Sequence, residues 1–258
     1  MNTIQSIVLA AVQGITELLP ISSTGHILLV AELFFKNMPT VFLLTILQLG
    51  STIAIIVGFK EIIFKNFFTK KKWSLFAKIA LGSIPAIAVA LVFQDVIEKY
   101  FHTNIVIALS LILWGILMIA VENIKGLNKE KTKDIEQINY KQSFIIGIAQ
   151  AFAIIPGTSR SGSTTVAGVL LGIEKYTAIS FSFLLGLPVL IGSFAFEMFK
   201  QRDSLAGVIT VNNGIAIIIS FVFGYLSLII LRKISKEKFL TYFGIYRLIL
   251  GALILFLL

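Results

Sequence analysis

The stretch QGITELLPISSTGH, from Gln13 to His26, places an acid, two serines, two threonines and a histidine around one proline. It overlaps an apolar run, Ile4 to Leu19, that is shorter than the roughly 20 residues a helix needs to cross the hydrocarbon core. Pro20 removes a backbone donor and favours a break in the helix. The stretch therefore predicts a helix that enters a membrane, breaks at the proline and returns to the side from which it came.

The composition of the whole chain supports a membrane setting. Of its 258 residues, 57% are hydrophobic and 14% are charged, whereas soluble domains are roughly 45–50% apolar. The absence of cysteine excludes disulfides, thiolate metal sites and a cysteine nucleophile. The net charge of +9 is typical of cytoplasmic loops and contacts with anionic headgroups in so apolar a chain, and we expect no nucleic-acid partner. An all-α integral membrane protein is predicted.

Six apolar runs are long enough to span a bilayer, and one further run is too short. The short run, Phe144 to Ile155, stops at Pro156 as the first one stops at Pro20. The six long runs are Val41 to Phe59, Phe76 to Phe93, Asn104 to Val121, Ala178 to Phe199, Gly214 to Leu231 and Tyr242 to Leu258.

Loop charges predict the orientation of these spans. Basic residues gather after the first, third and fifth spans: Lys60, Lys65, Lys70, Lys71, Lys72, Lys125, Lys129, Lys131, Lys133, Lys141, Arg232, Lys233, Lys236 and Lys238. The opposite side carries only Lys36, Lys99, Lys200 and Arg202. By the positive-inside rule the first group is cytoplasmic, so both termini face outward. The two short runs would then dip into the membrane from opposite sides.

The two halves of the chain also resemble each other. The offset along the sequence from Pro20 to Pro156 is the same as that from Ser23 to Ser159 and that from Gly50 to Gly186. Each half has three spans, an odd number, so the second half would begin on the opposite side of the membrane and be inverted relative to the first. Interrupted helices in matching positions of such a repeat point to a site near the membrane midplane. We predict one membrane domain, residues 1–258, with six transmembrane helices, two opposed re-entrant helical hairpins and an inverted-topology repeat. The halves cover about 1–122 and 140–258, joined by a cytoplasmic linker at 123–139; chance similarity of two apolar halves is the alternative.

Polar residues in the first hairpin form a candidate site. Gln13 and Glu17, four residues apart, share one helical face, and past the proline Ser22, Ser23 and His26 share another. An ionisable side chain in hydrocarbon costs several kcal/mol unless it is paired or wet, which makes Glu17 and His26 functional candidates. The alternative is a hydrogen-bonded knot that merely holds the hairpin together.

The second hairpin contains PGTSRSGST, from Pro156 to Thr164, which has the features of an anion-binding site. Its glycines allow tight turns, its hydroxyls donate, and Arg160 offers a planar fork for phosphate oxygens. The helix that follows would add its N-terminal amides. Arg160 could instead pair with Glu17 in a purely structural ion pair.

Together, QGITELLPISSTGH and PGTSRSGST resemble the undecaprenyl-diphosphate phosphatase family, also described as bacitracin-resistance proteins. The resemblance extends over essentially the whole chain, including ILQLGSTIAII, FSFLLGLP and YRLIL. It implies a multi-pass enzyme of the bacterial cytoplasmic membrane that removes the terminal phosphate of a long polyprenyl diphosphate. It also implies a homodimer, a divalent cation and a similar fold. Glu17 matches an acid of the family motif, whereas Gln13 stands where many members have a second glutamate.

The residues and the resemblance assign roles in this site. Glu17, Ser23, His26 and Arg160 are the predicted catalytic residues. Glu17, with Gln13 as a weaker ligand, is predicted to hold Mg²⁺ or Ca²⁺. The predicted substrate-binding residues are Gln13, Ser22, Thr24, Gly157, Thr158, Ser159, Ser161 and Thr164. Ser23 activated by His26 is the preferred nucleophile; a phosphohistidine at His26 and an activated water are the alternatives.

A transporter or lipid flippase is the main rival function, because inverted repeats with a midplane polar site are typical of secondary transporters. The two activities could coexist in one protein. A non-catalytic scaffold would tolerate loss of the polar side chains. An ion channel is disfavoured, because no ring of acids and no carbonyl filter is visible in the sequence.

Overall fold

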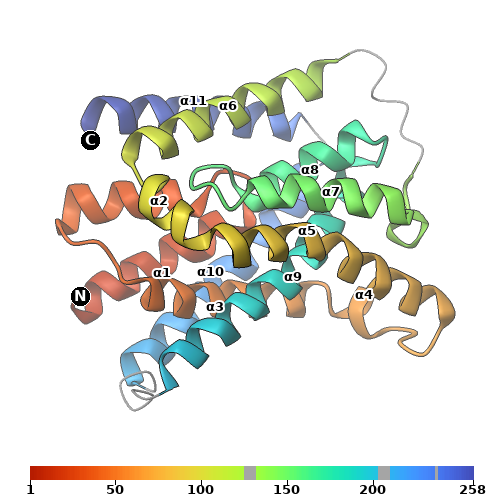
Figure 1. Ribbon diagram of the computed structural model, residues 1–258, viewed down its shortest axis with the longest axis horizontal. Coiled ribbons are helices and arrows are strands. Elements are labelled where there is room, and N and C mark those ends of the chain that lie inside the picture. Colours follow the sequence, from red (N-terminus) through yellow and green to blue (C-terminus); the bar gives the residue numbers. More distant parts are fainter. Residues whose placement is uncertain (125–131, 203–209, 236–237) are drawn as a thin grey trace.

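The computed structural model describes residues 1–124, 132–202, 210–235 and 238–258. Within these ranges the chain is helical and forms no strand, apart from one isolated bridge between Thr132 and Ile173 (Figure 1). The predicted all-α class is therefore confirmed for the described residues.

The helices are, in chain order, α1 (Thr3–Leu18), α2 (Ser23–Val30), the π-helical turn η1 (Ala31–Phe35), α3 (Val41–Gly58), α4 (Lys60–Phe64), α5 (Lys70–Tyr100), α6 (Asn104–Asn123), the 3₁₀ turn η2 (Ile135–Gln137), α7 (Tyr140–Phe152), α8 (Arg160–Leu170), α9 (Lys175–Lys200), α10 (Val211–Ile234) and α11 (Phe239–Leu257).

Six of these helices are long and apolar enough to cross a membrane: α3, α5 over Lys70–Phe93, α6, α9, α10 and α11. Their mean hydropathies lie between 2.0 and 2.6. They correspond to the six predicted spans, so a multi-pass membrane protein is confirmed. The main difference is α5, whose 31 residues extend past the predicted span at both ends. Its start is set by Thr69, whose hydroxyl accepts a hydrogen bond from the amide of Lys72.

Two shorter helix pairs, α1–α2 and α7–α8, lie among the long helices. At 1.5 Å per residue, α1 is about 24 Å long and α7 about 20 Å, both below the roughly 30 Å of a hydrocarbon core. Both begin with the same capping box, formed by Asn2 with Gln5 in α1 and by Asn139 with Gln142 in α7. The two pairs therefore start with the same local structure.

The turns inside the two pairs also match. Ser22 precedes α2 with φ 70° and ψ 101°, and Ser159 precedes α8 with φ 68° and ψ 110°. Few non-glycine residues adopt positive φ, so this agreement makes Ser22 the conformational counterpart of Ser159. The sequence pairing of Ser23 with Ser159 was off by one position. Relative to this serine, the proline comes one position earlier in the second pair, and an alignment on the prolines therefore shifts the serines.

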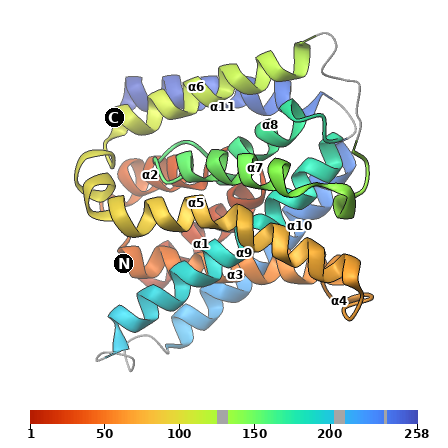
Figure 2. The ribbon, with the colours of Figure 1, turned by 45° about the vertical axis from the view of Figure 1, so that its right-hand side comes forward.

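The short helices pack against long helices of the other half. In both views α1 lies along α10 and α7 lies along α5, while α6 pairs with α11 (Figures 1 and 2). Glycines allow this close approach. A Cβ added at Gly14 would lie 2.5 Å from the carbonyl oxygen of Ser220, and one added at Gly147 would overlap the backbone of Gly82.

The largest apolar core joins the inner ends of the short helices to the long ones. It includes Leu18 of α1, Val166 of α8, Phe183 of α9 and Leu228 of α10, all buried. Close packing of this kind resists displacement of either turn, because each side chain contacts several others. The core thus supports the polar residues that follow each turn.

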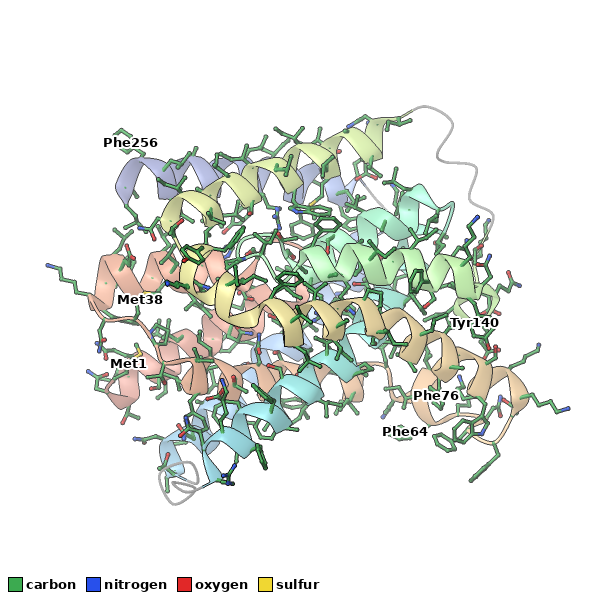
Figure 3. All side chains as sticks on the ribbon, viewed as in Figure 1. Met1, Met38, Phe64, Phe76, Tyr140 and Phe256 are labelled. Carbon is green, nitrogen blue, oxygen red and sulfur yellow. The ribbon has the colours of Figure 1, made fainter. Side chains whose placement is uncertain are left out.

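The chain ends lie together at one end of the helical bundle. Met1, Met38 and Phe256 mark that end in Figure 3, and Phe64 and Tyr140 mark the opposite end. The α1–α2 pair starts and returns near the end with the termini, whereas α7 starts at the end that carries α4 (Figures 1 and 2). Termini at one end agree with an even number of spans.

Candidate active site

A polar pocket of about 190 Å³ lies where the two turns meet α3, α5 and α9. This volume is several times the roughly 30 Å³ that one water molecule occupies. Its polar lining residues are Thr16, Glu17, Ser22, Ser23, Thr24, Gln48, Gln150, Ser159, Arg160, Ser161 and Ser193. Two segments far apart in the sequence thus converge on one cavity, as the hairpin motifs predict.

Glu17, in the last turn of α1, is the centre of the hydrogen bonding in this pocket. Its Oε2 accepts hydrogen bonds from Ser23 Oγ at 2.8 Å and from Gln13 Nε2 at 3.1 Å. Its Oε1 pairs with Arg160 Nη2 at 3.1 Å. The side chains of Arg160 and Glu17 are only 11% and 9% exposed, so the ion pair is largely removed from solvent. The pairing offered as a structural alternative does form, and it forms on the wall of the pocket.

Arg160 is held by its place at the start of α8 and by a glycine on α9. Its Nη1 donates to the carbonyl oxygen of Ser182 at 3.3 Å. A Cβ added at Gly186 would overlap the guanidinium, so any larger residue at that position would push Arg160 away from Glu17. Gly186, noted in the sequence for its repeat spacing, therefore makes room for the arginine.

The N-terminus of α8 lies at the same pocket, which is lined by Ser159, Arg160 and Ser161. Ser159 Oγ accepts a hydrogen bond from the amide of Gly162 at 3.2 Å, which uses one of the early donors of the helix. The amides of Arg160 and Ser161, at the first two helical positions, have no partner within the helix and are the donors that remain for an anion.

A second arginine, Arg247 of α11, joins the two turns. It is fully buried. Its Nη1 donates to the carbonyl oxygen of Pro20 at 3.3 Å, and its Nη2 donates to those of Gly157 at 2.8 Å and Thr158 at 3.0 Å. Carbonyls exposed by a break in a helix need donors inside a membrane protein. Arg247 supplies them to both breaks and so positions the turns relative to each other.

His26 is placed differently from the expectation. Its Nδ1 lies 2.8 Å from the carbonyl oxygen of Ser22, and its Nε2 lies 2.7 Å from the hydroxyl of Tyr246. The carbonyl can only accept, so Nδ1 carries the hydrogen and, in the neutral ring, Nε2 accepts from Tyr246. Ser23 donates to Glu17 instead. The predicted Ser23–His26 pair is therefore not formed, because the first residue of α2 turns back toward α1 while His26 faces α11.

Three other predicted residues lie behind the pocket wall. Gln13 is buried and acts through its hydrogen bond to Glu17. Thr158 is buried and its carbonyl oxygen is used by Arg247. Thr164 is fully buried, and its hydroxyl bonds to the carbonyl oxygen of Arg160 at 2.7 Å. These three side chains are buried and do not line the pocket, so they support the site from behind its wall.

Four polar residues on the wall were missed by the sequence reasoning: Thr16 of α1, Gln48 of α3, Gln150 of α7 and Ser193 of α9. Thr16 lies inside the first motif but was given no role, and the other three lie in apolar helices without a recognisable motif. A signal existed for Gln150, because its offset from Gln13 along the sequence equals the offset between the capping asparagines of α1 and α7. Gln48 lies two residues before Gly50 in a stretch quoted only for its glycine.

Two apolar grooves adjoin the polar pocket. The larger, about 620 Å³, lies between α5 and α7 and is lined by Pro85, Ala88, Val89, Phe93, Val96, Ile97, Phe101, Ile148, Ala151, Phe152, Ile154 and Ile155. Ile154 and Ile155 also line the polar pocket, so the two cavities are neighbours. The smaller groove, about 390 Å³ between α3, α5 and α9, includes the polar residues Thr45, Ser193 and Glu197.

The arrangement combines the parts needed for phosphoryl transfer. A serine hydroxyl donates to a carboxylate that can take its proton, and a guanidinium lies on the other side of that carboxylate. The described residues contain no group of three or more His, Cys, Asp or Glu side chains that could hold a metal by themselves. A single carboxylate suits Mg²⁺, which commonly binds one or two carboxylates together with substrate phosphates. Gln13, the predicted weaker ligand, turns its amide nitrogen and not its oxygen toward Glu17.

Comparison with known proteins agrees with this chemistry. The chain is 36% identical to undecaprenyl-diphosphatase 1 of Clostridioides difficile (strain 630), over 97% of this chain and 94% of that protein. It is 38% identical to the undecaprenyl-diphosphatase of Methanococcus aeolicus, over 99% and 98% of the two chains. It is 34% identical to that of Enterococcus faecalis, over 96% and 94%. The sequence model of bacitracin resistance protein BacA matches residues 6–253. The chain belongs to the bacitracin resistance protein BacA family.

Proposed function

We propose that this protein is an undecaprenyl-diphosphate phosphatase, which converts undecaprenyl diphosphate to undecaprenyl phosphate and inorganic phosphate. Its relatives are named for this activity. The observation that carries the proposal is the series Ser23, Glu17 and Arg160 in a polar pocket that adjoins an apolar groove. The product is the lipid carrier of cell-wall synthesis, so the enzyme recycles that carrier.

The diphosphate binds between Arg160 and the start of α8. Its non-bridging oxygens are negative and only accept hydrogen bonds, so they need donors and positive charge. The Arg160 guanidinium and the amides of Arg160 and Ser161 supply both. These groups are fixed before the substrate arrives, which lowers the reorganisation that phosphoryl transfer requires.

Ser23 is the nucleophile, and Glu17 takes its proton. The hydroxyl already donates to Glu17 Oε2 at 2.8 Å, within the range for a general base. As Ser23 Oγ bonds to the terminal phosphorus, the bond from that phosphorus to the bridging oxygen breaks, and undecaprenyl phosphate leaves with the bonding electrons. Arg160 stabilises the charge that moves to the phosphate oxygens. His26, bonded to Ser22 and Tyr246, has no part in this proton transfer.

Water completes the reaction. It attacks the phosphorus of phosphoserine, and Ser23 Oγ leaves and takes back the proton held by Glu17. One hydrogen of the water stays on the product phosphate and the other is released to solvent. Two displacements predict retention of configuration at phosphorus, whereas direct attack by water on the diphosphate would invert it.

A divalent cation fits this site through Glu17 and the substrate. Glu17 is the carboxylate that would hold it, and phosphate oxygens and water would fill the other positions. The cation would neutralise charge on the diphosphate. Mg²⁺ fits better than Ca²⁺, which commonly takes six to eight oxygen ligands from flexible sites.

The polyprenyl chain lies in the groove between α5 and α7. That groove shares Ile154 and Ile155 with the polar pocket and is almost entirely apolar. Burying apolar chain there is favourable because each methylene removed from water contributes about 0.8 kcal/mol. The rival groove beside α9 is less suitable, because a hydrocarbon chain would cover the polar side chains of Ser193 and Glu197.

Purified protein in detergent with undecaprenyl diphosphate and Mg²⁺ tests the proposal. We expect phosphate release by the native protein and a loss of at least about 100-fold in kcat/KM for Arg160→Ala, since transition-state donors contribute on that order. Arg202→Ala, at an exposed residue just beyond the end of α9, is the matched control and should keep full activity. No release by the native protein, or full activity of Arg160→Ala, would reject the assignment.

The membrane topology is part of the proposal. The α1–α2 and α7–α8 pairs are re-entrant hairpins of an inverted repeat, supported by their length, matched caps and matched turns. Both termini face outward from the bacterial cytoplasmic membrane, supported by the loop charges; Lys125, Lys129, Lys131 and Lys236 of that count lie outside the described residues. Single cysteines near each terminus, labelled by an impermeant reagent in intact cells, test the orientation. The homodimer rests on the resemblance alone and is tested by native mass spectrometry.

Lipid flipping remains a second candidate, favoured by the two helix pairs that begin at opposite ends of the bundle. Proteoliposomes with fluorescent polyprenyl phosphate distinguish the two functions. Translocation that survives in Ser23→Ala, together with absence of phosphate release by the native protein, would favour the flippase.

A further inference from the structure

Gln150, in the last turn of α7, is a buried amide with no partner. Its side chain is 2% exposed, and neither Oε1 nor Nε2 has a hydrogen-bond partner. Among the described residues it is the one side chain with two such buried polar atoms. A buried polar group left without a partner costs roughly 1–3 kcal/mol. Such a group is rare in native proteins and calls for an explanation, for example a role in catalysis or binding.

The amide lies on the wall of the active-site pocket. Gln150 lines it together with Arg160 and Ser23, which come from α8 and α2. One turn earlier on α7, Ile146 is in the core and Gly147 lies against the backbone of Gly82. Because residues three and four apart share a helix face, this close packing directs Gln150 inward. Gln150 thus forms part of the cavity wall on the side of α7.

Comparison with Gln13 indicates what kind of ligand is missing. Gln13 and Gln150 occupy equivalent positions in α1 and α7, because each follows the capping asparagine of its helix by the same number of positions. Gln13 Nε2 donates to Glu17, four residues further on. The residue four beyond Gln150 is Ile154, which has no acceptor. The second glutamine therefore keeps the donor but lacks the carboxylate.

We infer that Gln150 is a substrate-binding residue whose amide nitrogen donates to a non-bridging oxygen of the diphosphate. The inference rests on the proposed phosphatase function. Ionised phosphate oxygens only accept hydrogen bonds, so an unpaired NH₂ group is complementary to them. Arg160, Ser161 and Ser23 supply donors from the two turns, and Gln150 supplies one from α7. The head group is then held from three elements.

Three variants test the inference: Gln150→Leu removes both polar atoms, Gln150→Glu removes the donor and adds charge, and Gln142→Leu is the control. Gln142 lies two turns earlier on α7, where it bonds to Asn139 and Leu171 away from the pocket. The measurements are kcat and KM for farnesyl diphosphate in detergent with Mg²⁺, and the melting temperature without substrate in EDTA.

Gln150→Leu should raise KM about 10- to 100-fold with a smaller change in kcat, since a hydrogen bond to a charged group is lost. It should melt at or above the native temperature, because an unsatisfied amide is removed. Gln150→Glu should raise KM at least as far, by repulsion. The control should show the opposite pattern, a lower melting temperature with unchanged KM.

The inference is overturned if the native protein hydrolyses the substrate while Gln150→Leu keeps its KM within about twofold. A drop of several degrees in the melting temperature of Gln150→Leu would also overturn it, since that result means a structural partner. A lower KM for Gln150→Glu with Mg²⁺ would mean a cation ligand and would overturn it too. If the native protein releases no phosphate, the proposed function itself fails, and the inference fails with it.

Discussion

Replacing Glu17 by Gln tests two roles of this residue: Glu17 accepts the proton of Ser23, and it holds Arg160 in an ion pair. The substitution keeps the shape of the side chain but removes the charge and puts an NH₂ group where an oxygen accepts. Ser23, Gln13 and Arg160 all direct donors at the two oxygens of Glu17. The amide has one oxygen, so it can accept either from Ser23 and Gln13 at the Oε2 position or from Arg160 at the Oε1 position, but not at both. The variant should therefore lose the base and release the guanidinium.

The distance between Glu17 and Arg160 sets the strength of the attraction that the substitution removes. At 3.1 Å and an effective dielectric constant of 20, the attraction between Glu17 and Arg160 is about 5 kcal/mol, before the desolvation that offsets it. A diphosphate must compete with this attraction for Arg160. Without it, we expect a diphosphate to bind Glu17→Gln at least about tenfold more tightly, for which 1.4 kcal/mol suffices. Turnover should fall by about 10²- to 10⁴-fold, the usual contribution of a general base.

The assay uses farnesyl methylenebisphosphonate, which cannot be cleaved at the bridging position. Its affinity is measured calorimetrically in EDTA, so that a cation held by Glu17 does not contribute, and phosphate release is measured separately with Mg²⁺. Glu61→Gln, on the exposed helix α4, is the control and should change neither quantity. Weaker binding in EDTA combined with turnover within tenfold of the native value would refute the reasoning, because Glu17 would then neither restrain Arg160 nor act as the base.

Three further substitutions test other parts of the site. Ser23→Ala should lower kcat by at least about 10³-fold and abolish the phosphoserine trapped by acid quench; activity within tenfold would favour direct attack by water. Arg247→Lys keeps the charge but cannot reach both turns, so the protein should lose about 3 kcal/mol of stability, or roughly 5–10 °C in melting temperature; an unchanged melting temperature would show that the turns hold without it. Ala151→Trp should obstruct the groove between α5 and α7 and raise KM for undecaprenyl diphosphate about tenfold, the equivalent of two displaced methylenes, with little effect on dimethylallyl diphosphate. Ala80→Trp, on α5 outside that groove, is its control, and equal effects of the two would place the lipid elsewhere.

Much of the fold was readable because it depends on local properties of the sequence. The six spans follow from the length and hydropathy of continuous runs. Both are properties of the run itself and do not depend on which helices lie next to it. The breaks at Pro20 and Pro156 follow from the missing backbone donor of proline. The convergence of Glu17, Ser23 and Arg160 followed from the two motifs and was found in the pocket.

The contacts of individual side chains were not readable in the same way. Helical spacing placed Ser23 and His26 on one face, yet Ser23 bonds to Glu17 of α1 and His26 to Tyr246 of α11, since spacing along one helix does not fix which neighbouring helix each side chain meets. Thr164 was assigned to the substrate and is instead covered by α9. Gln150 carried no motif and became visible only as a buried amide without a partner.

By itself, the sequence determined that this chain is a multi-pass helical membrane protein with two interrupted helices and an acid, a serine and an arginine near the breaks. Those features depend on hydropathy, proline chemistry and short-range spacing, which act along the chain. Only the tertiary structure decided which donor meets which acceptor, because that depends on the packing of helices distant in sequence. The buried Arg247 of the last helix is the clearest case. The sequence shows only that the stretch YRLIL contains an arginine, whereas the fold shows that this arginine donates to backbone carbonyls of both turns.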